Sequence, residues 1–315
     1  MTTSTEGAPR TIPGLHHVTA ISGPPQANLD FYVRTLRQRL VKRTVNFDDP
    51  GTYHLYYGNE GAEPGSILTF FPFMDAGPGR AGPGMASAFA YAVDDLDGWM
   101  ERLASDAIDF EGPWTRLGER GIALGDPDGL RVELIEGGAR DGAFHSVTLW
   151  LREIEATARV LEVMGYAREG EEGDATGGTG GTERRTRFRA GDGERGAVVD
   201  LLTSDASSIG RSGAGTVHHV AFRATSPEDQ RAWRDRLTEA GMDVTPVIDR
   251  QYFDAIYFRT PGGVLFEIAT DPPGFAVDED PAHLGEALKL PARYEPMRER
   301  IERALPALKL PKVAA

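Results

Sequence analysis

Two histidine pairs stand out in this sequence, because together they hold four of its seven histidines. The first pair is His16 and His17 in the run LHHVT, and the second is His218 and His219 in the run VHHVA. A carboxylate, Glu267, follows in the run GVLFEIAT. Two imidazoles and one carboxylate on one side of a metal ion form a facial triad, which leaves coordination positions open for a substrate and for oxygen. These residue types therefore predict a site for a divalent metal such as Fe(II), Mn(II), Ni(II) or Zn(II).

Both pairs lie in runs whose apolar residues are spaced as in β-strands. Adjacent side chains of a strand point to opposite faces of its sheet, so only one histidine of each pair can face a given site directly. The other histidine is expected on the far face, or at the margin of the site where the strand twists or bulges. The pattern therefore argues against counting all four histidines as ligands.

Internal repetition indicates which histidine of each pair is the ligand candidate. A strand-like run followed by an amphipathic helix recurs four times, and about three further strands complete each repeat. The runs at 126–136 and 260–270 share a turn with Pro and Gly, a strand and an acidic residue. The runs at 65–71 and 196–202 are weaker copies of the same ending. The sequence therefore predicts four βαβββ modules.

Alignment of the four modules compares positions within this one chain. The position of the second histidine holds His17, Ala88, Ser146 and His219. The acidic position near the end of each module holds Thr69, Glu133, Asp200 and Glu267. Only the first and last modules keep the histidine, so the predicted site is a single one, built from His17, His219 and Glu267. This prediction requires the first and last modules to meet in space.

The segments between the strands are expected to include helices with apolar side chains at helical spacing. The first helix is predicted over about 26–40, and the second and third carry the apolar positions from Leu96 to Leu103 and from Ile154 to Leu161. Ser226, followed by proline, predicts the start of the fourth helix. A last helix is expected over 292–308, and the Gly- and Thr-rich run 173–183 is interpreted as a hairpin loop.

The overall composition excludes several classes of function. The chain has 315 residues and a formal net charge of -14, which repels phosphate backbones and anionic lipids, so neither nucleic acid nor a membrane is an expected partner. No apolar run is long enough to span a bilayer, and residues 1–14 lack the apolar core of a signal peptide and are expected to form a loose tail. The absence of cysteine excludes disulfides and thiolate ligands and fits a cytoplasmic protein, while homo-oligomerisation stays open.

These repeats and motifs resemble the vicinal oxygen chelate superfamily, which includes glyoxalase I, bleomycin-binding proteins, fosfomycin-resistance enzymes and extradiol ring-cleaving dioxygenases. More closely, the runs LHHVT, YHLYYGN, ILTFFPF and GVLFEIAT, with residues 31–50 and 274–280, are similar to bacterial ring-cleaving dioxygenases of the hydroquinone type. The resemblance covers about residues 14–290. It implies an α+β fold in which four βαβββ modules form two domains of curved mixed sheets. The domains are expected at 12–138 and 139–272, followed by a C-terminal helical tail at 273–315.

The resemblance also implies an activity and a set of site residues. The metal ligands of that family match His17, His219 and Glu267 of this sequence. The residues that surround them match His16, His218, Thr19, Arg250 and Tyr257. The implied reaction is cleavage of a hydroquinone- or catechol-like aromatic by O2 with bound Fe(II), for which Mn(II) is the alternative. His16 or His218 would act as acid or base, and Arg250 would pair with charge on the substrate or product.

Two other functions on the same scaffold stay open from the sequence. A metal-dependent isomerase or lyase of the glyoxalase kind would use the same ligands without O2. A non-enzymatic resistance protein that binds an aromatic drug would use no metal. The fold by itself does not choose among these functions.

Overall fold

The computed structural model describes residues 11–137, 142–176, 178–191 and 195–310, and the statements below concern these residues. Most of the loose tail predicted at 1–14 lies outside the described residues. In the described part of the chain, no helix combines the length and apolar character needed to cross a membrane.

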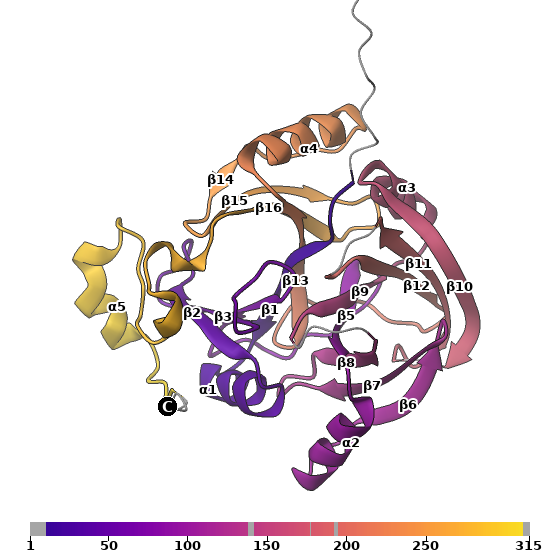
Figure 1. The fold of residues 1–315 in the computed structure, drawn as a ribbon, viewed down its shortest axis with the longest axis horizontal. Coiled ribbons are helices and arrows are strands. Elements are labelled where there is room, and N and C mark those ends of the chain that lie inside the picture. The colour runs from indigo at the N-terminus through magenta and orange to yellow at the C-terminus, as the bar shows by residue number, and fades with distance from the viewer. Residues whose placement is uncertain (1–10, 138–141, 177, 192–194, 311–315) are drawn as a thin grey trace, which may run out of the picture.

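Two mixed sheets of eight strands each form the body of the molecule (Figure 1). Across the first sheet the strands are β14 (Ile248–Asp249), β15 (Phe253–Arg259), β16 (Leu265–Pro273), β13 (Thr216–Ala224), β1 (Leu15–Ser22), β4 (Ile67–Pro72), β3 (Tyr53–Gly58) and β2 (Arg39–Val45). Across the second sheet they are β10 (Tyr166–Thr176), β11 (Thr182–Ala190), β12 (Val198–Ser204), β9 (Phe144–Trp150), β5 (Met85–Val93), β8 (Arg131–Glu136), β7 (Glu119–Gly125) and β6 (Glu111–Arg116). The order of strands within each module is therefore the same in both sheets.

The sheets combine modules from opposite ends of the chain, as the histidine alignment requires. Modules one (β1–β4) and four (β13–β16) form the first sheet, and modules two (β5–β8) and three (β9–β12) form the second. Antiparallel pairing of β1 with β13 places Thr19 opposite His219, and pairing of β5 with β9 places Ala88 opposite Thr148. The two halves of the chain predicted as domains, 12–138 and 139–272, thus each contribute one module to each sheet.

The first helix is shorter than predicted. It runs as α1 over Pro25–Asp30 and continues as a π-helical turn over Phe31–Thr35, whereas the prediction extended over about 26–40. Arg37 has a backbone φ of 55°, a left-handed conformation that cannot continue a right-handed helix. Leu40, whose spacing suggested the helix, is instead buried in β2.

The next three helices match their predictions: α2 (Leu96–Ser105), α3 (Glu155–Val163) and α4 (Pro227–Glu239). The side chain of Ser226 accepts a hydrogen bond from the backbone N–H of Asp229, which satisfies one free donor at the start of α4.

The predicted C-terminal helix at 292–308 is likewise reduced to a 3-10 turn at Glu295–Met297 and α5 at Arg298–Ala304. Leu305, with an extended backbone, ends it because Pro306 follows.

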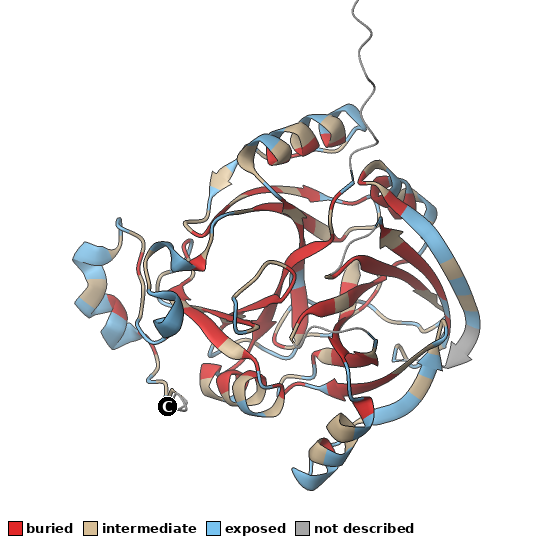
Figure 2. Ribbon diagram, viewed as in Figure 1, coloured by how far each residue is buried: buried red, intermediate tan, exposed pale blue. Residues whose placement is uncertain are grey.

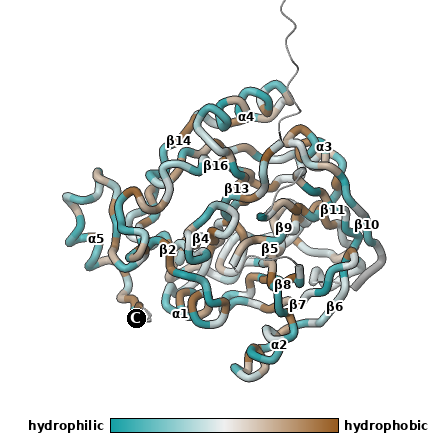
Figure 3. The backbone as a smooth tube through the Cα atoms, viewed as in Figure 1, coloured by the Kyte–Doolittle hydropathy of each residue, from teal (hydrophilic) through white to brown (hydrophobic). Residues whose placement is uncertain are grey.

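Burial follows the sheets closely. Figure 2 shows the central strands of both sheets as buried, with long exposed stretches on the edge strands β10 and β6 and on α5. In Figure 3 the apolar residues concentrate in the same central strands, and one apolar cluster extends through both sheets. Strands β10 and β11 pair antiparallel up to Thr176 opposite Thr182, so a hairpin forms where it was predicted. Its loop is shorter than the predicted 173–183, because residues 173–176 belong to β10 and residues 182–183 to β11, and residue 177 lies outside the described part.

Candidate metal centre

The predicted ligands come from three neighbouring strands of the first sheet. His17 lies on β1, His219 on β13 and Glu267 on β16, and these strands are adjacent in the order β16-β13-β1. Parallel pairing places Ala221 of β13 opposite Glu267, and antiparallel pairing places the same residue opposite His17. The sheet therefore brings together side chains that are 202 positions apart in the sequence.

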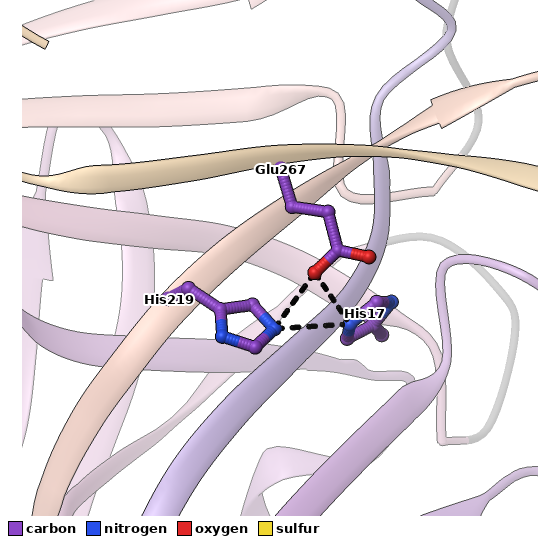
Figure 4. Close-up of side chains that lie close together, drawn as sticks. All are labelled: His17, His219 and Glu267. Atoms are coloured by element: carbon purple, nitrogen blue, oxygen red, sulfur yellow. Dashed lines mark hydrogen bonds and ion pairs between the residues drawn. The ribbon is translucent and has the colours of Figure 1, made fainter. Parts of the chain in front are cut away.

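The ligand atoms of these residues converge on one point (Figure 4). The Nε2 atom of His219 lies 2.8 Å from Oε2 of Glu267, and Nε2 of His17 lies 3.5 Å from the same oxygen. The two Nε2 atoms are 3.3 Å apart. One ligand atom from each residue thus lies within 4.8 Å of the other two, as atoms that share one metal ion do.

The surroundings of these side chains fit a bound cation. Glu267 is fully buried, and among the described residues neither of its carboxylate oxygens has a partner in a well-directed hydrogen bond. A buried carboxylate in that state is costly unless a positive charge compensates it. Divalent Fe, Mn or Zn would supply that charge, and the two imidazoles with one carboxylate match the donors these metals accept.

The second histidine of each pair is oriented by the first. His16 Nδ1 lies 2.9 Å from His17 Nδ1, and His218 Nδ1 lies 2.8 Å from His219 Nδ1. Each pair therefore joins through its Nδ1 atoms, which leaves the Nε2 atoms of His17 and His219 directed at Glu267. Metal-binding histidines are commonly oriented in this way, through a hydrogen bond at the nitrogen that does not bind the metal.

The protonation states also suit a metal. Burial opposes ionisation of Glu267, but the imidazoles of His17 and His219 outweigh it and hold the carboxyl pKa well below its usual range. Burial lowers the pKa of His219 below its ordinary value, although Glu267 acts in the opposite direction. At neutral pH the carboxylate is therefore ionised and His219 is neutral, which are the states that bind metals.

A cavity of about 390 Å³ opens beside these three residues, large enough for a single aromatic ring with substituents. Six Phe and Tyr side chains contribute to its wall: Phe47, Tyr56, Phe71, Phe73, Phe253 and Tyr257. Asn46, Asp48 and Ser212 add polar groups to the lining. The cavity thus combines flat apolar surfaces with the carboxylate and imidazoles at one place in its wall.

Four of the five predicted surrounding residues line this cavity, and His16 does not. His16 is buried and packs its ring 5.3 Å from that of Phe253, so its place is behind the ligand His17. His218 is exposed and borders the cavity. Thr19 lines the cavity, with its hydroxyl 3.0 Å from that of Thr69.

Arg250 and Tyr257 form a connected pair in the cavity wall. Nε of Arg250 donates to the hydroxyl of Tyr257 at 3.2 Å, and its Nη1 lies 3.4 Å from Asp48. Burial and the nearby carboxylate of Glu267 raise the pKa of the Tyr257 phenol, so this hydroxyl stays protonated at neutral pH. Tyr257 can therefore donate a hydrogen bond into the cavity.

His54 is a lining residue that the sequence analysis did not include in the site. Its Nε2 lies 2.8 Å from the hydroxyl of Thr69, and its Nδ1 lies 2.9 Å from the hydroxyl of Tyr56. A hydrogen-bonded chain thus runs from Tyr56 through His54 and Thr69 to Thr19 beside the ligand His17. Burial lowers the pKa of His54, so it is neutral at physiological pH. The alternation of the run YHLYYG, which places His54 and Tyr56 on one face of β3, was the available signal.

The comparisons with known proteins agree with this fold. The model of the glyoxalase/bleomycin resistance protein/dioxygenase superfamily matches residues 14–134 and again 143–268. The chain is 46% identical to a Bacillus subtilis protein named "Putative ring-cleaving dioxygenase MhqO", over 93% of this chain and 95% of that protein. It is 34% identical to a chlorohydroquinone/hydroquinone 1,2-dioxygenase of Sphingobium indicum, over 94% of this chain and 97% of that enzyme. The crystal structure of a "putative dioxygenase" from Bacillus subtilis superposes with a TM-score of 0.88 at 42% identity, and the match covers 96% of this chain and 100% of that chain.

The chain belongs to the glyoxalase/bleomycin resistance protein/dioxygenase superfamily, in which two curled mixed sheets carry few helices. Within it, the relatives that match over nearly their whole length are named ring-cleaving dioxygenases. The protein is accordingly an oxidoreductase of the dioxygenase class.

Proposed function

We propose that the protein cleaves the ring of a small aromatic carrying hydroxyl groups, of the hydroquinone or catechol kind, with O2 and with Fe(II) held by His17, His219 and Glu267. The observation that carries the proposal is the buried carboxylate of Glu267, which no well-directed donor satisfies, in the wall of an aromatic cavity beside two imidazoles. The hydroquinone class is supported by the Sphingobium indicum relative, which is named for that substrate and for its chloro derivative.

When bound, Fe(II) supplies the redox chemistry that lets an electron-rich ring react with O2. The residues of the chain perform the remaining tasks. The aromatic wall holds the ring flat and excludes water from the reacting face. Arg250 and Tyr257 offer hydrogen-bond donors to an oxygen of the substrate or product.

Proton transfer falls to histidines of the cavity wall. His218 borders the cavity, whereas His16 is screened from it by its neighbour, so His218 is the better placed of the two predicted acid/base residues. His54 is a second proton carrier, because its hydrogen bond to Thr69 connects it to the hydroxyl of Thr19. Substitution of each histidine in turn by glutamine would separate their contributions.

Oxygen uptake after anaerobic reconstitution tests the function. Protein loaded with Fe(II) without air, and in parallel with Mn(II), is mixed with hydroquinone, chlorohydroquinone or catechol in an oxygen electrode. The expected result is consumption of one O2 for each ring lost, with the ring absorbance disappearing at the same rate. No uptake with any of these rings would refute the dioxygenase proposal. Turnover of a glyoxalase substrate without O2 would identify an isomerase, and tight binding of an aromatic by metal-free protein would identify a binding protein.

A further inference from the structure

The second sheet carries a cavity of about 360 Å³ at the position that corresponds to the metal centre of the first sheet. The correspondence follows from register. In the first sheet Thr19 pairs with His219, and in the second Thr148 pairs with Ala88, so Ala88 occupies the position of His219. Glu267 pairs with Ala221 in the first sheet and Glu133 pairs with Ala90 in the second, so Glu133 occupies the position of Glu267. Ala88, Glu133 and Thr148 all line this second cavity, which we call the arginine cavity. The repeat of the fold has therefore produced two cavities, and among the described residues only the first holds a cluster of side chains that could bind one metal ion.

The described lining of the arginine cavity contains guanidinium groups and no histidine. Its Glu133 is engaged by two of them: Nη1 of Arg116 lies 2.9 Å from one oxygen and Nε of Arg131 lies 3.0 Å from the other. Burial alone would raise the pKa of Glu133, but these arginines and Arg185 outweigh it and lower that pKa. The carboxylate that would bind a metal is thus ionised and already compensated, so this cavity is not a second metal site.

The wall holds more positive than negative charge. Its charged lining consists of Arg80, Arg116, Arg131 and Arg185 with Asp128, Glu133 and Glu183, which leaves one net positive charge. This excess belongs to the lining alone, because carboxylates behind it pair with the arginines: Asp200 with Arg185 and Arg187, Glu119 with Arg187, and Glu111 with Arg131. On a chain with a net charge of -14, a positively charged cavity is an unusual local feature.

A buried donor in the wall lacks an acceptor. Trp150 lines the arginine cavity with 3% of its surface exposed, and its indole N–H has no hydrogen-bond partner among the described residues. An unpaired buried N–H is costly, and an acceptor on a ligand would satisfy it. Among the described residues, the hydrogen bond of Arg116 to Glu133 also uses only one of the five N–H donors that a guanidinium offers. The wall therefore offers donors and positive charge together with the flat surface of an indole ring.

We propose that the arginine cavity binds a small organic monocarboxylate about as large as one substituted ring, held by Arg116, Arg185 and Trp150. The planar guanidinium fork matches a carboxylate in two parallel hydrogen bonds. The lining side chains, with their planar guanidinium groups and one net positive charge, match a planar, singly charged carboxylate better than a tetrahedral phosphate. The ligand can be an aromatic acid or an acyclic unsaturated acid, and both share the carboxylate that the site recognises. The site does not depend on the metal of the first sheet.

Calorimetric titration of the full chain with sodium benzoate and with sodium crotonate tests the proposal, because one probe is aromatic and the other acyclic. Benzyl alcohol serves as the uncharged control and inorganic phosphate as the dianion control. We expect one carboxylate bound per chain, weakened by added salt, and no heat from benzyl alcohol or phosphate. The stronger of the two carboxylate probes identifies the source class of the ligand.

Three variants locate the bound carboxylate. Arg116→Met removes one donor fork while Arg131 still compensates Glu133, and it should weaken benzoate binding about tenfold or more. Trp150→Phe removes the indole N–H together with the five-membered ring that carries it, keeps an aromatic ring in the wall, and should weaken binding about threefold or more. Arg250→Met, the equivalent change in the metal cavity, should leave benzoate binding unchanged. Circular dichroism confirms that each variant is folded, and Trp150→Phe tests the site if Arg116→Met does not fold.

Two results would overturn the proposal. One is the absence of measurable heat with benzoate and crotonate at tens of millimolar ligand. The other is loss of binding in Arg250→Met with full binding in Trp150→Phe, which would place the carboxylate in the metal cavity.

Discussion

The replacement of Glu267 by glutamine should weaken metal binding at least about 100-fold, while the matched replacement of Glu133 should leave it unchanged. The two glutamates occupy equivalent positions on β16 and β8, and both are buried. Only Glu267 faces two imidazoles, since Glu133 faces guanidinium groups. Glutamine keeps the size of the side chain and removes its charge, so the comparison isolates the carboxylate as a ligand.

The expected change in Tm follows from the thermodynamic linkage between metal binding and folding. A metal present at about a hundred times its Kd stabilises the folded chain by roughly 2.7 kcal/mol. Unfolding entropy is roughly 2.1 cal/mol/K per residue, so for a chain of 315 residues the metal should raise Tm by about 4 °C. Loss of a partner that merely orients a ligand costs about 10- to 100-fold in metal affinity, so loss of a ligand itself costs at least about 100-fold. At the same metal concentration Glu267→Gln would then retain roughly 0.4 kcal/mol of stabilisation, a rise in Tm of less than about 1 °C.

Differential scanning fluorimetry with and without Mn(II) or anaerobic Fe(II) measures this quantity. The readout is the difference between the two scans of each variant, so a change in the stability of the metal-free protein cancels. The expected order is a full rise for wild type and Glu133→Gln and almost none for Glu267→Gln. A full rise in Glu267→Gln, or its loss in Glu133→Gln, would refute the assignment of the ligands.

Three stability predictions follow from buried groups elsewhere in the fold. Lys42 is fully buried and pairs with Asp278 at 2.7 Å and Glu279 at 2.5 Å. Lys42→Met leaves both carboxylates without this cation, so it should lower the free energy of unfolding, measured by chemical denaturation, by about 3–5 kcal/mol. An effect below about 1 kcal/mol would contradict this role. Burial raises the pKa of Asp126 to about 6, so between about pH 4 and 6 the folded chain binds the proton more tightly and this group makes stability fall as pH rises. Asp126→Asn should therefore gain stability relative to wild type by roughly 3 kcal/mol from pH 4 to pH 7 in urea titrations, and a constant difference would show that Asp126 does not titrate there. Ser226→Ala removes the cap of α4 and should cost about 1 kcal/mol in the same assay, with no change in the metal-induced rise in Tm.

Much of the candidate site could be predicted because the repeat makes positions comparable within one chain. The alignment selected His17 and His219 over their neighbours and paired them with Glu267, and these are the side chains that the first sheet brings together. The alternation rule predicted that only one histidine of the first pair faces the site directly, and His17 but not His16 lines the cavity, although the resemblance had included His16 among the surrounding residues. In the second pair the rule failed, because His218 and His219 both line the cavity. A register shift in the pairing of β1 with β13, between the partners His219 and Val217, interrupts the regular alternation at His218.

The position of the remaining residues depended on how the strands pack. Alternation in the run YHLYYG places His54 and Tyr56 on one face of β3, but it does not say what that face meets. His54 reaches the cavity because β3 pairs with β4, which places its ring beside the hydroxyl of Thr69. The first helix was predicted too long because Leu40 continues a helical spacing while actually belonging to β2, where sheet pairing overrides local preference. The arginine cavity was not predicted either, since its charges come from strands far apart in the sequence.

The sequence by itself determined the four modules, the residue types at the site and the fact that only modules one and four keep the ligand histidine. It could do so because strand alternation and internal repetition depend only on the order of residues along the chain. Only the tertiary structure decided that modules one and four share a sheet, which places His17, His219 and Glu267 around one point. It also decided that Glu267 is buried without a well-directed hydrogen bond, whereas Glu133 is enclosed by arginines. Burial and the distance between charges depend on the whole fold, and they distinguish a metal centre from an arginine-lined cavity built on the same repeat.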